Sequence, residues 1–203
     1  MTTTKESIAR LAFSNIGISK VVTSIDTPTT LEEKLIAAIF DATRDYVLTD
    51  FPWPFATEFI ELGDVDGDTD DPVNTDWVFT YALPEGCMTL RRLVPADGRG
   101  ADRKIPFRIG RNADVPVIFT DEEDAVAEMT VSITDVTLFD AHFIEALAWR
   151  LAYKLAPIVS KDKTLVQTAL GMYEREKQLA AVSALNQGQA DPPADSSFIT
   201  SRN

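Results

Sequence analysis

The FPWPF segment at residues 51–55 constrains the fold more than any other stretch of the chain. Its two prolines cannot continue a helix and favour an extended backbone. Its three aromatic rings each bring a large apolar surface that needs a packing partner. Because a helix-like pattern ends near Asp50, we expect a junction here between a helical layer and a β layer. A small-molecule pocket is the alternative interpretation.

Two helices are predicted before this segment. The first begins at Thr3, with Glu6 completing a capping box, and Gly17 is suited to end it. The second begins at Thr30, with Glu33 completing a second capping box. Apolar residues follow both caps at helical spacing: Ile8, Leu11 and Ala12 in the first helix, and Leu35, Ile39, Ala42 and Tyr46 on one side of the second, with Ile36, Phe40 and Val47 beside them.

A different pattern, of short apolar runs separated by turn residues, extends from residue 53 to residue 136. In this region Trp77, Phe79 and Tyr81 alternate onto one face of an expected strand. Six short strands within about eighty residues indicate a small antiparallel sandwich or barrel. The expected strands cover residues 53–62, 77–83, 88–94, 105–109, 115–120 and 125–134.

Helical periodicity returns at residue 138 and predicts two more helices. Pro157 is expected to stop or kink the first of them, and Ser160 to open the second. The remaining residues, 186–203, are polar, and we expect a flexible tail there in the isolated protein. The face of the first helix that is expected to be buried contains Phe139, Phe143, Ala146, Leu147 and Leu151.

This order of elements predicts an α+β fold with an inserted β module. Helices in 1–52 and 137–185 are expected to pack together, because isolated amphipathic helices of this length are marginally stable. The β-rich module would occupy residues 53–136, and the extended or disordered tail residues 186–203.

Charge and cysteine content exclude several classes of protein. The net charge of −13 argues against general affinity for nucleic acid. A single cysteine, Cys87, excludes an intrachain disulfide and a cysteine-based zinc site. The N-terminal residues lack the basic-then-apolar order of a signal peptide, and no apolar run approaches the length of a membrane span. We therefore expect a protein made in the cytoplasm, with no membrane partner.

The residues that most often carry chemistry form no recognisable site. The one histidine, His142, fits a structural or surface position in an amphipathic helix. The aspartate-rich segment 64–71 does not match an EF-hand, which leaves a solvated acidic loop or an irregular cation site. The 32 acidic residues are too many for any carboxylate pair to be informative. We assign no catalytic, metal or cofactor-binding residue and expect no enzyme.

Two sets of residues are singled out as structural or partner-binding. The first is an aromatic set, expected in the core or along a seam rather than in a ligand site: Trp53, Phe55, Trp77 and Tyr81. The second is the stretch 91–111, which holds seven basic residues against two acidic ones in an otherwise acidic chain. Ordinary strand-surface charge, contact with an acidic subunit or partner, and contact with nucleic acid remain open for it. The candidate contact residues are Arg91, Arg92 and Arg108.

Three motifs, in this order, resemble the head–tail connector or adaptor proteins of short-tailed bacteriophages, similar to the tail tubular protein A group. They are LAFSNIGI at residues 11–18 with VTSI at 22–25, ATRDYVL at 42–48 leading into FPWPFA at 51–56, and WVFTYALPEGC at 77–87. The resemblance covers about residues 4–95, and residues 137–185 agree only in helical character. No catalytic residue carries over, because the motifs look structural.

The resemblance implies a virion protein of the phage neck, assembled in the host cytoplasm. Such adaptors form a homo-oligomeric ring, usually of twelve copies, that joins the portal protein to the tail nozzle protein and leaves a channel for DNA ejection. Phe198 and Ile199 give the tail an apolar anchor that is expected to contact the portal. The alternatives are a carboxylate-based glycan hydrolase of the phage tail and a β module that binds a carbohydrate or another ligand.

Overall fold

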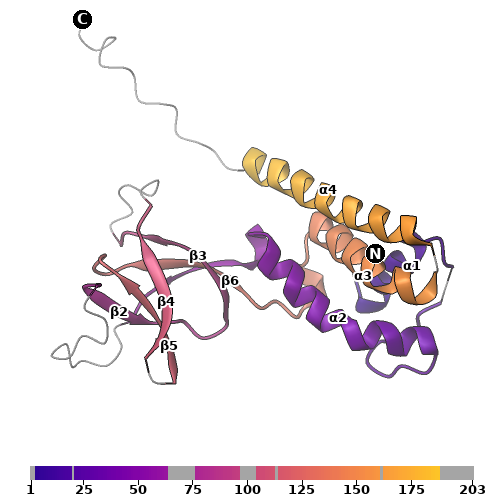
Figure 1. Cartoon of the computed structure of the whole chain (residues 1–203), viewed down its shortest axis with the longest axis horizontal. Coiled ribbons are helices and arrows are strands. Elements are labelled where there is room, and N and C mark those ends of the chain that lie inside the picture. The colour runs from indigo at the N-terminus through magenta and orange to yellow at the C-terminus, as the bar shows by residue number, and fades with distance from the viewer. Residues whose placement is uncertain are drawn as a thin grey trace, which may run out of the picture.

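Four helices pack into one bundle in this computed structural model (Figure 1). Two of them precede the β region in the sequence, and two follow it. They are α1 (Lys5–Asn15), α2 (Leu31–Asp50), α3 (Ala141–Val159) and α4 (Lys163–Gln187). The structure describes residues 3–19, 21–63, 76–96, 104–112, 114–160 and 162–187. Because α3 packs against each of the other three helices, the prediction that the N-terminal helices pack on the C-terminal ones is confirmed.

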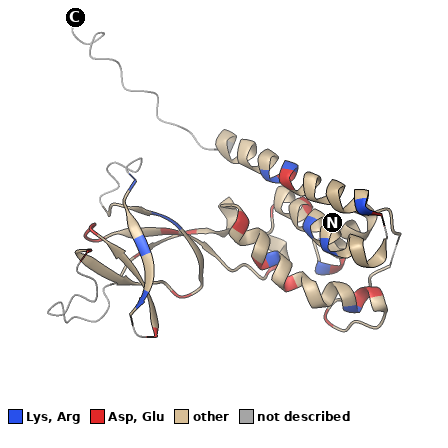
Figure 2. Ribbon diagram, viewed as in Figure 1, with Lys and Arg blue, Asp and Glu red and all other residues tan. Residues whose placement is uncertain are grey.

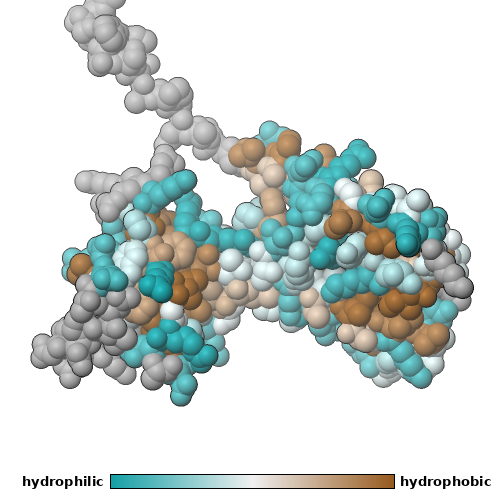
Figure 3. Space-filling model, in the orientation of Figure 1, coloured by the Kyte–Doolittle hydropathy of each residue, from teal (hydrophilic) through white to brown (hydrophobic). Residues whose placement is uncertain are grey.

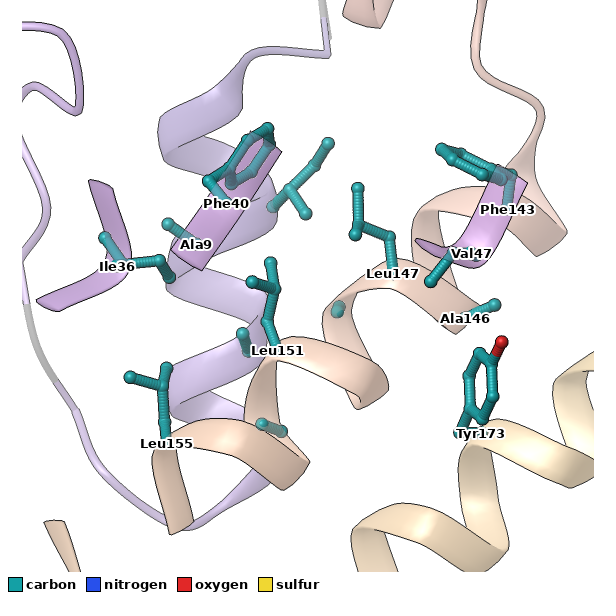
Figure 4. Packing of buried hydrophobic residues seen from close by; sticks show 14 of the residues in the cluster. Ala9, Ile36, Phe40, Val47, Phe143, Ala146, Leu147, Leu151, Leu155 and Tyr173 are labelled. Carbon is teal, nitrogen blue, oxygen red and sulfur yellow. The ribbon is translucent and has the colours of Figure 1, made fainter. Parts of the chain in front are cut away.

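The bundle core is centred on α3, which alternates leucine and alanine along its buried surface. The alanines let neighbouring helices approach closely, and the leucines fill the space between them. Figure 4 shows Leu147, Leu151 and Leu155 of α3 on the side that faces Ile36 and Phe40 of α2. All five residues of the predicted buried face, from Phe139 to Leu151, are buried.

The ends of α1 follow local capping rules, with one correction to the sequence prediction. Thr4, not Thr3, caps the helix, and its hydroxyl accepts a hydrogen bond from the backbone N–H of Ser7 at 3.1 Å. Glu6 instead accepts a bond from the N–H of Ile25, so it is not the capping-box partner. Gly17 ends the helix as predicted: its φ is +74°, and the N–H of Ile18 reaches back to the carbonyl of Phe13.

The start of α2 is organised by Glu33, a carboxylate that is 1% exposed. The predicted capping box of Thr30 and Glu33 is confirmed. The Glu33 carboxylate also accepts bonds from the backbone and hydroxyl of both Thr23 and Thr29, at 2.6 to 3.0 Å. These bonds hold the pKa of Glu33 far below its ordinary value. One buried side chain therefore fixes the loop that precedes the helix.

Of the two neighbouring sets of apolar residues predicted along α2, the set of Ile36, Phe40 and Val47 forms the buried face. Tyr46, from the other set, is 43% exposed. Two differences from the prediction concern α3 and α4. Pro157 is accommodated inside the last turns of α3, which ends at Val159, and α4 begins at Lys163 rather than at Ser160.

The β region forms two three-stranded antiparallel sheets with a shared core, in agreement with the predicted α+β class. The strands are β1 (Thr57–Glu61), β2 (Phe79–Ala82), β3 (Cys87–Val94), β4 (Phe107–Asn112), β5 (Val115–Thr120) and β6 (Val126–Val131). Their orders are β1-β6-β3 and β2-β5-β4. Leu90, Leu93 and Met129 from the first sheet pack with Tyr81 and Ile118 from the second. All six predicted strands are present, with shifted ends.

Two chain segments connect the β part to the helical part, and the two parts lie next to each other along the long axis of the molecule (Figure 1). The first connection, residues 51–56, includes a 3₁₀ turn at Pro54–Ala56. The second, residues 132–140, includes a 3₁₀ turn at Val136–Leu138. The strand predicted over 53–62 is therefore wrong for its first four residues. Pro54 is well suited to the first turn of the 3₁₀ segment, because its missing N–H is not needed there.

Candidate functional site

Five aromatic rings gather where the two connections meet the helical part, and we call them the aromatic joint: Phe51, Trp53, Phe55, Phe139 and Phe143. Phe143 is central, with ring centroids 5.0 Å from Trp53, 5.1 Å from Phe55 and 4.6 Å from Phe139. Phe51 packs on Trp53 at 4.9 Å. Edge-to-face contacts at these distances contribute more than area burial alone. The joint therefore fixes both connections against the start of α3.

Trp53 also provides a hydrogen-bond donor for a backbone carbonyl at the end of α2. Its ring is fully buried, and its Nε1–H donates to the carbonyl oxygen of Val47 at 2.7 Å. The last carbonyls of a helix have no partner within the helix. Trp53 is difficult to replace, because its ring fills the core and its N–H also satisfies one of these carbonyls.

The four predicted aromatic residues occupy two different cores. Trp53 and half-buried Phe55 pack in the helical core, whereas Tyr81 lies in the β core and donates its hydroxyl to the carbonyl of Glu122 at 3.1 Å. Trp77 is half-buried just before β2. The partners that complete the aromatic joint, Phe139 and Phe143, were predicted as core residues of a helix, but nothing in the sequence paired them with Trp53.

Arg91 of β3 donates hydrogen bonds to further backbone carbonyls at the C-terminus of α2. Its Nη2 lies 3.1, 2.9 and 3.0 Å from the carbonyl oxygens of Leu48, Thr49 and Phe51. Its Nε donates to the hydroxyl of Thr130 on β6 at 2.8 Å. A cation at a helix C-terminus is favoured by the helix dipole. Arg91 thus has a role within the chain that the charge pattern did not predict, and it links the β part to α2.

Three other arginines of the basic stretch, Arg92, Arg108 and Arg111, lie on strands. Arg92 pairs with Glu128 on the adjacent strand β6, and Arg108 is exposed on β4. Figure 2 shows basic positions on β4 facing the viewer. Arg99 and Arg103 lie outside the described residues, as do the acidic segment 64–71 and the tail residues Phe198 and Ile199. Contact of Arg92 and Arg108 with a partner stays a prediction.

A second network attaches α4 to the end of α2. The Asp50 carboxylate accepts bonds from the Tyr173 hydroxyl and from Lys177 Nζ, both at 2.6 Å. Although burial acts to raise the pKa of Asp50, these two hydrogen bonds keep it below its ordinary value. Burial and the Asp50 charge raise the pKa of Tyr173, so its hydroxyl remains a donor. The end of α2 is therefore fixed from β3, from the aromatic joint and from α4.

His142 lines a hollow of about 310 Å³ beside the aromatic joint, together with Trp53, Phe55 and Ser183 of α4. Its Nδ1 is 3.7 Å from a carboxylate oxygen of Glu176. Burial, together with the charge of Glu176, raises the pKa of Glu145. This hollow is where the predicted alternative, a ligand pocket at the aromatic segment, would lie.

Comparisons with protein-family models and with curated proteins found no match to this chain. Among the helices that the structure describes, none combines the length and apolar character needed to cross a membrane. Within the same described ranges, no group of histidine, cysteine and acidic side chains is arranged to hold a metal ion. The best-defined arrangement in the described chain is therefore the joint between its two parts.

Proposed function

We propose that this chain is a structural virion adaptor, a subunit of a ring that joins a portal to a tail nozzle and leaves a channel for DNA. The support is the resemblance of its motifs to the adaptors of short-tailed phages. The observation that carries the proposal is the placement of those motifs. The FPWPFA motif forms the first connection and most of the aromatic joint, and ATRDYVL forms the end of α2 that Trp53 and Arg91 close.

A fixed joint of this kind suits a subunit that works between two partners. The helical and β parts lie at opposite ends of the long axis (Figure 1), so each part presents its own surface. Hydrogen bonds from β3 to α2 and ring contacts from both connections oppose bending between them. In our proposal, the helical part binds the portal, and the β part binds neighbouring subunits or the next tail component.

Exposed apolar side chains at both ends are consistent with such contacts. On the helical part, Leu31 is 69% and Ile158 is 58% exposed, and both border a hollow that Phe13 also lines. Figure 3 shows apolar surface on this part of the molecule. On the β part, Phe59 and Val78 are 60% and 71% exposed. Grouped apolar exposure, such as that of Leu31 and Ile158 at one hollow, is typical of surfaces that bind another protein.

The charge of the chain fits a channel through which DNA passes without being held. A net charge of −13 repels phosphate, so DNA contact with the ring would be weak and non-specific. The hollow beside Trp53 and Phe55 supports a second candidate function, binding of a carbohydrate or another small ligand. A titration with oligosaccharides tests that candidate, with the tryptophan fluorescence of the parent protein and of Trp53→Phe as the readout.

Quantitative mass spectrometry of purified virions tests the proposed location and role. We expect this chain in the particle, in a fixed ratio close to one copy per portal subunit. Its recovery only in the host lysate, or in the particle at a small fraction of the portal amount, would contradict the proposal. Truncation after Gln187 tests the tail separately: we expect weaker attachment to portals, and unchanged attachment would remove Phe198 and Ile199 from the contact.

A further inference from the structure

Arg150, near the middle of α3, is surrounded by tyrosines from three helices. Its guanidinium carbon lies 4.4 Å from the ring centroid of Tyr46 on α2, 4.9 Å from that of Tyr153 on α3 and 5.3 Å from that of Tyr173 on α4. All three distances are within the range of cation–π attraction. The rings hold the charge in place, and Tyr173 is itself fixed by its bond to Asp50.

The tyrosine rings do not satisfy the hydrogen-bonding capacity of this guanidinium. Its Nε is buried and has no acceptor. Within the described ranges, no hydrogen bond or ion pair joins Arg150 to another residue, whereas a guanidinium carries five N–H donors. The terminal nitrogens Nη1 and Nη2 are not enclosed, and Arg150 is half-buried. A cation that is held in place by rings, with its outer donors open to solvent, is positioned to bind an acceptor from outside the chain.

The charges near Arg150 favour an incoming anion. Lys154 follows one turn later on the same helix, and burial and the charge of Arg150 lower its pKa. The Asp50 charge interacts with that of Arg150, but the hydrogen bonds of this carboxylate go to Tyr173 and Lys177. Arg150 and Lys154 therefore place two cations on one face of α3, where a bound anion would relieve their mutual repulsion.

We infer that Arg150 is a receptor for a carboxylate side chain carried by a neighbouring protein. The planar end of a guanidinium matches the two oxygens of a carboxylate, and such bidentate pairs are both strong and directional. Tyr46, 43% exposed at the rim, offers the aromatic contact that accompanies arginine in protein interfaces. The inference does not depend on the virion role, because it rests on the tyrosines and the unmet donors alone.

The test uses the parent protein, labelled with ¹⁵N in its arginines, and follows the Nε–H resonance of Arg150 by NMR. The resonance that is missing from the spectrum of Arg150→Lys is assigned to Arg150. The probes are N-acetyl-aspartate amide, its neutral analogue N-acetyl-asparagine amide, and sodium chloride at matched ionic strength. We expect a saturable shift at millimolar aspartate probe, and no saturable shift with the other two. Lys154→Met is the matched control and should weaken this response by several-fold without abolishing it.

Two outcomes would overturn the inference. Equal shifts with all three probes would mean that the response is not specific for a carboxylate, and no shift would mean that the donors of Arg150 are not accessible. Citrate distinguishes the source of the carboxylate. Saturation by free citrate at micromolar concentration would assign the site to a small anion and would overturn the inference that the carboxylate belongs to a protein. Weak binding of citrate would support that inference.

Discussion

The Nη2 of Arg91 lies 2.9 Å from the carbonyl oxygen of Thr49, so a strand of the β part caps the last turn of α2. These residues are separated by 42 positions in the chain. The same guanidinium reaches Thr130 on β6. Because it bonds to elements of both parts at once, Arg91 contributes to the orientation of the β part on the helical bundle.

Replacement of Arg91 by methionine should destabilise the protein. Methionine preserves much of the apolar stem but leaves the Leu48 and Thr49 carbonyls without their partner. Hydrogen bonds to charged groups contribute about 1.5–3 kcal/mol, so we expect a loss of that size in the free energy of unfolding by urea. The matched control is Arg92→Met, which removes a surface ion pair with Glu128 and should cost less than about 1 kcal/mol. Equal effects of the two substitutions would refute the capping role.

Trp53 should be the most sensitive of the predicted aromatic residues. Trp53→Ala removes a fully buried ring from the aromatic joint, and such truncations cost about 3–5 kcal/mol. Trp53→Phe keeps an aromatic ring but leaves the Val47 carbonyl unpaired, which should cost about 1–3 kcal/mol. Trp77→Ala, at a half-buried position, should cost about 1 kcal/mol. Urea unfolding of the three variants checks this order.

These results show which structural features are local in sequence. The capping box of Thr30 and Glu33 and the glycine end at Gly17 depend on residues within one or two turns, so the sequence predicts them. The first capping box was misplaced by one residue because Thr3 and Glu6 fit the pattern equally well. Glu6 is instead used by the backbone of Ile25, in a loop that no local pattern locates.

The aromatic joint and the Arg91 contacts depend on segments that are distant in the chain, and the sequence did not predict them. A charge count placed Arg91 on a surface, because nothing in its neighbours indicates the end of a helix about forty residues earlier. Tyr46, expected with Leu35, Ile39 and Ala42 on one side of α2, packs its ring against Arg150 of α3, a contact that no local pattern indicates. Which aromatic residues meet is decided by how the connections fold, so Trp53 pairs with Phe143 rather than with Trp77 or Tyr81.

Charge reversal on the β surface tests the predicted partner contact. Arg92→Glu combined with Arg108→Glu should weaken assembly, and added salt should weaken assembly of the parent protein in the same direction, because both reduce attraction to an acidic surface. Arg91 is left unchanged, since its loss would disturb the fold. Sedimentation velocity across a salt series measures the effect. Unchanged assembly of the double variant at every salt concentration would rule out this surface.

Acid should unfold the start of α2 early. The pKa of Glu33 is lower in the folded protein than in the unfolded chain, so its contribution is complete above about pH 4.5 and is lost as the pH falls below that value. We expect Glu33→Gln to lower the melting temperature at pH 7 and to flatten its decline in acid. Parallel acid curves for the variant and the parent protein would show that the carboxylate does not stabilise the loop.

Glu145 should act in the opposite direction. Its pKa is raised in the folded protein by burial and by Glu176, so stability falls as the pH rises through that pKa. Glu145→Gln removes the charge and should raise the melting temperature at pH 7 more than at pH 4. Thermal melts at the two values measure the difference, and a larger gain at pH 4 would contradict the assigned sign.

The decisive measurement for the proposed ring is native mass spectrometry, at low salt, of this chain mixed with a portal protein encoded in the same genome. We expect one complex, whose mass equals that of the portal ring plus a fixed number of copies of this chain, enough to form a second closed ring. A portal ring of unchanged mass, with this chain remaining monomeric beside it, would contradict the account.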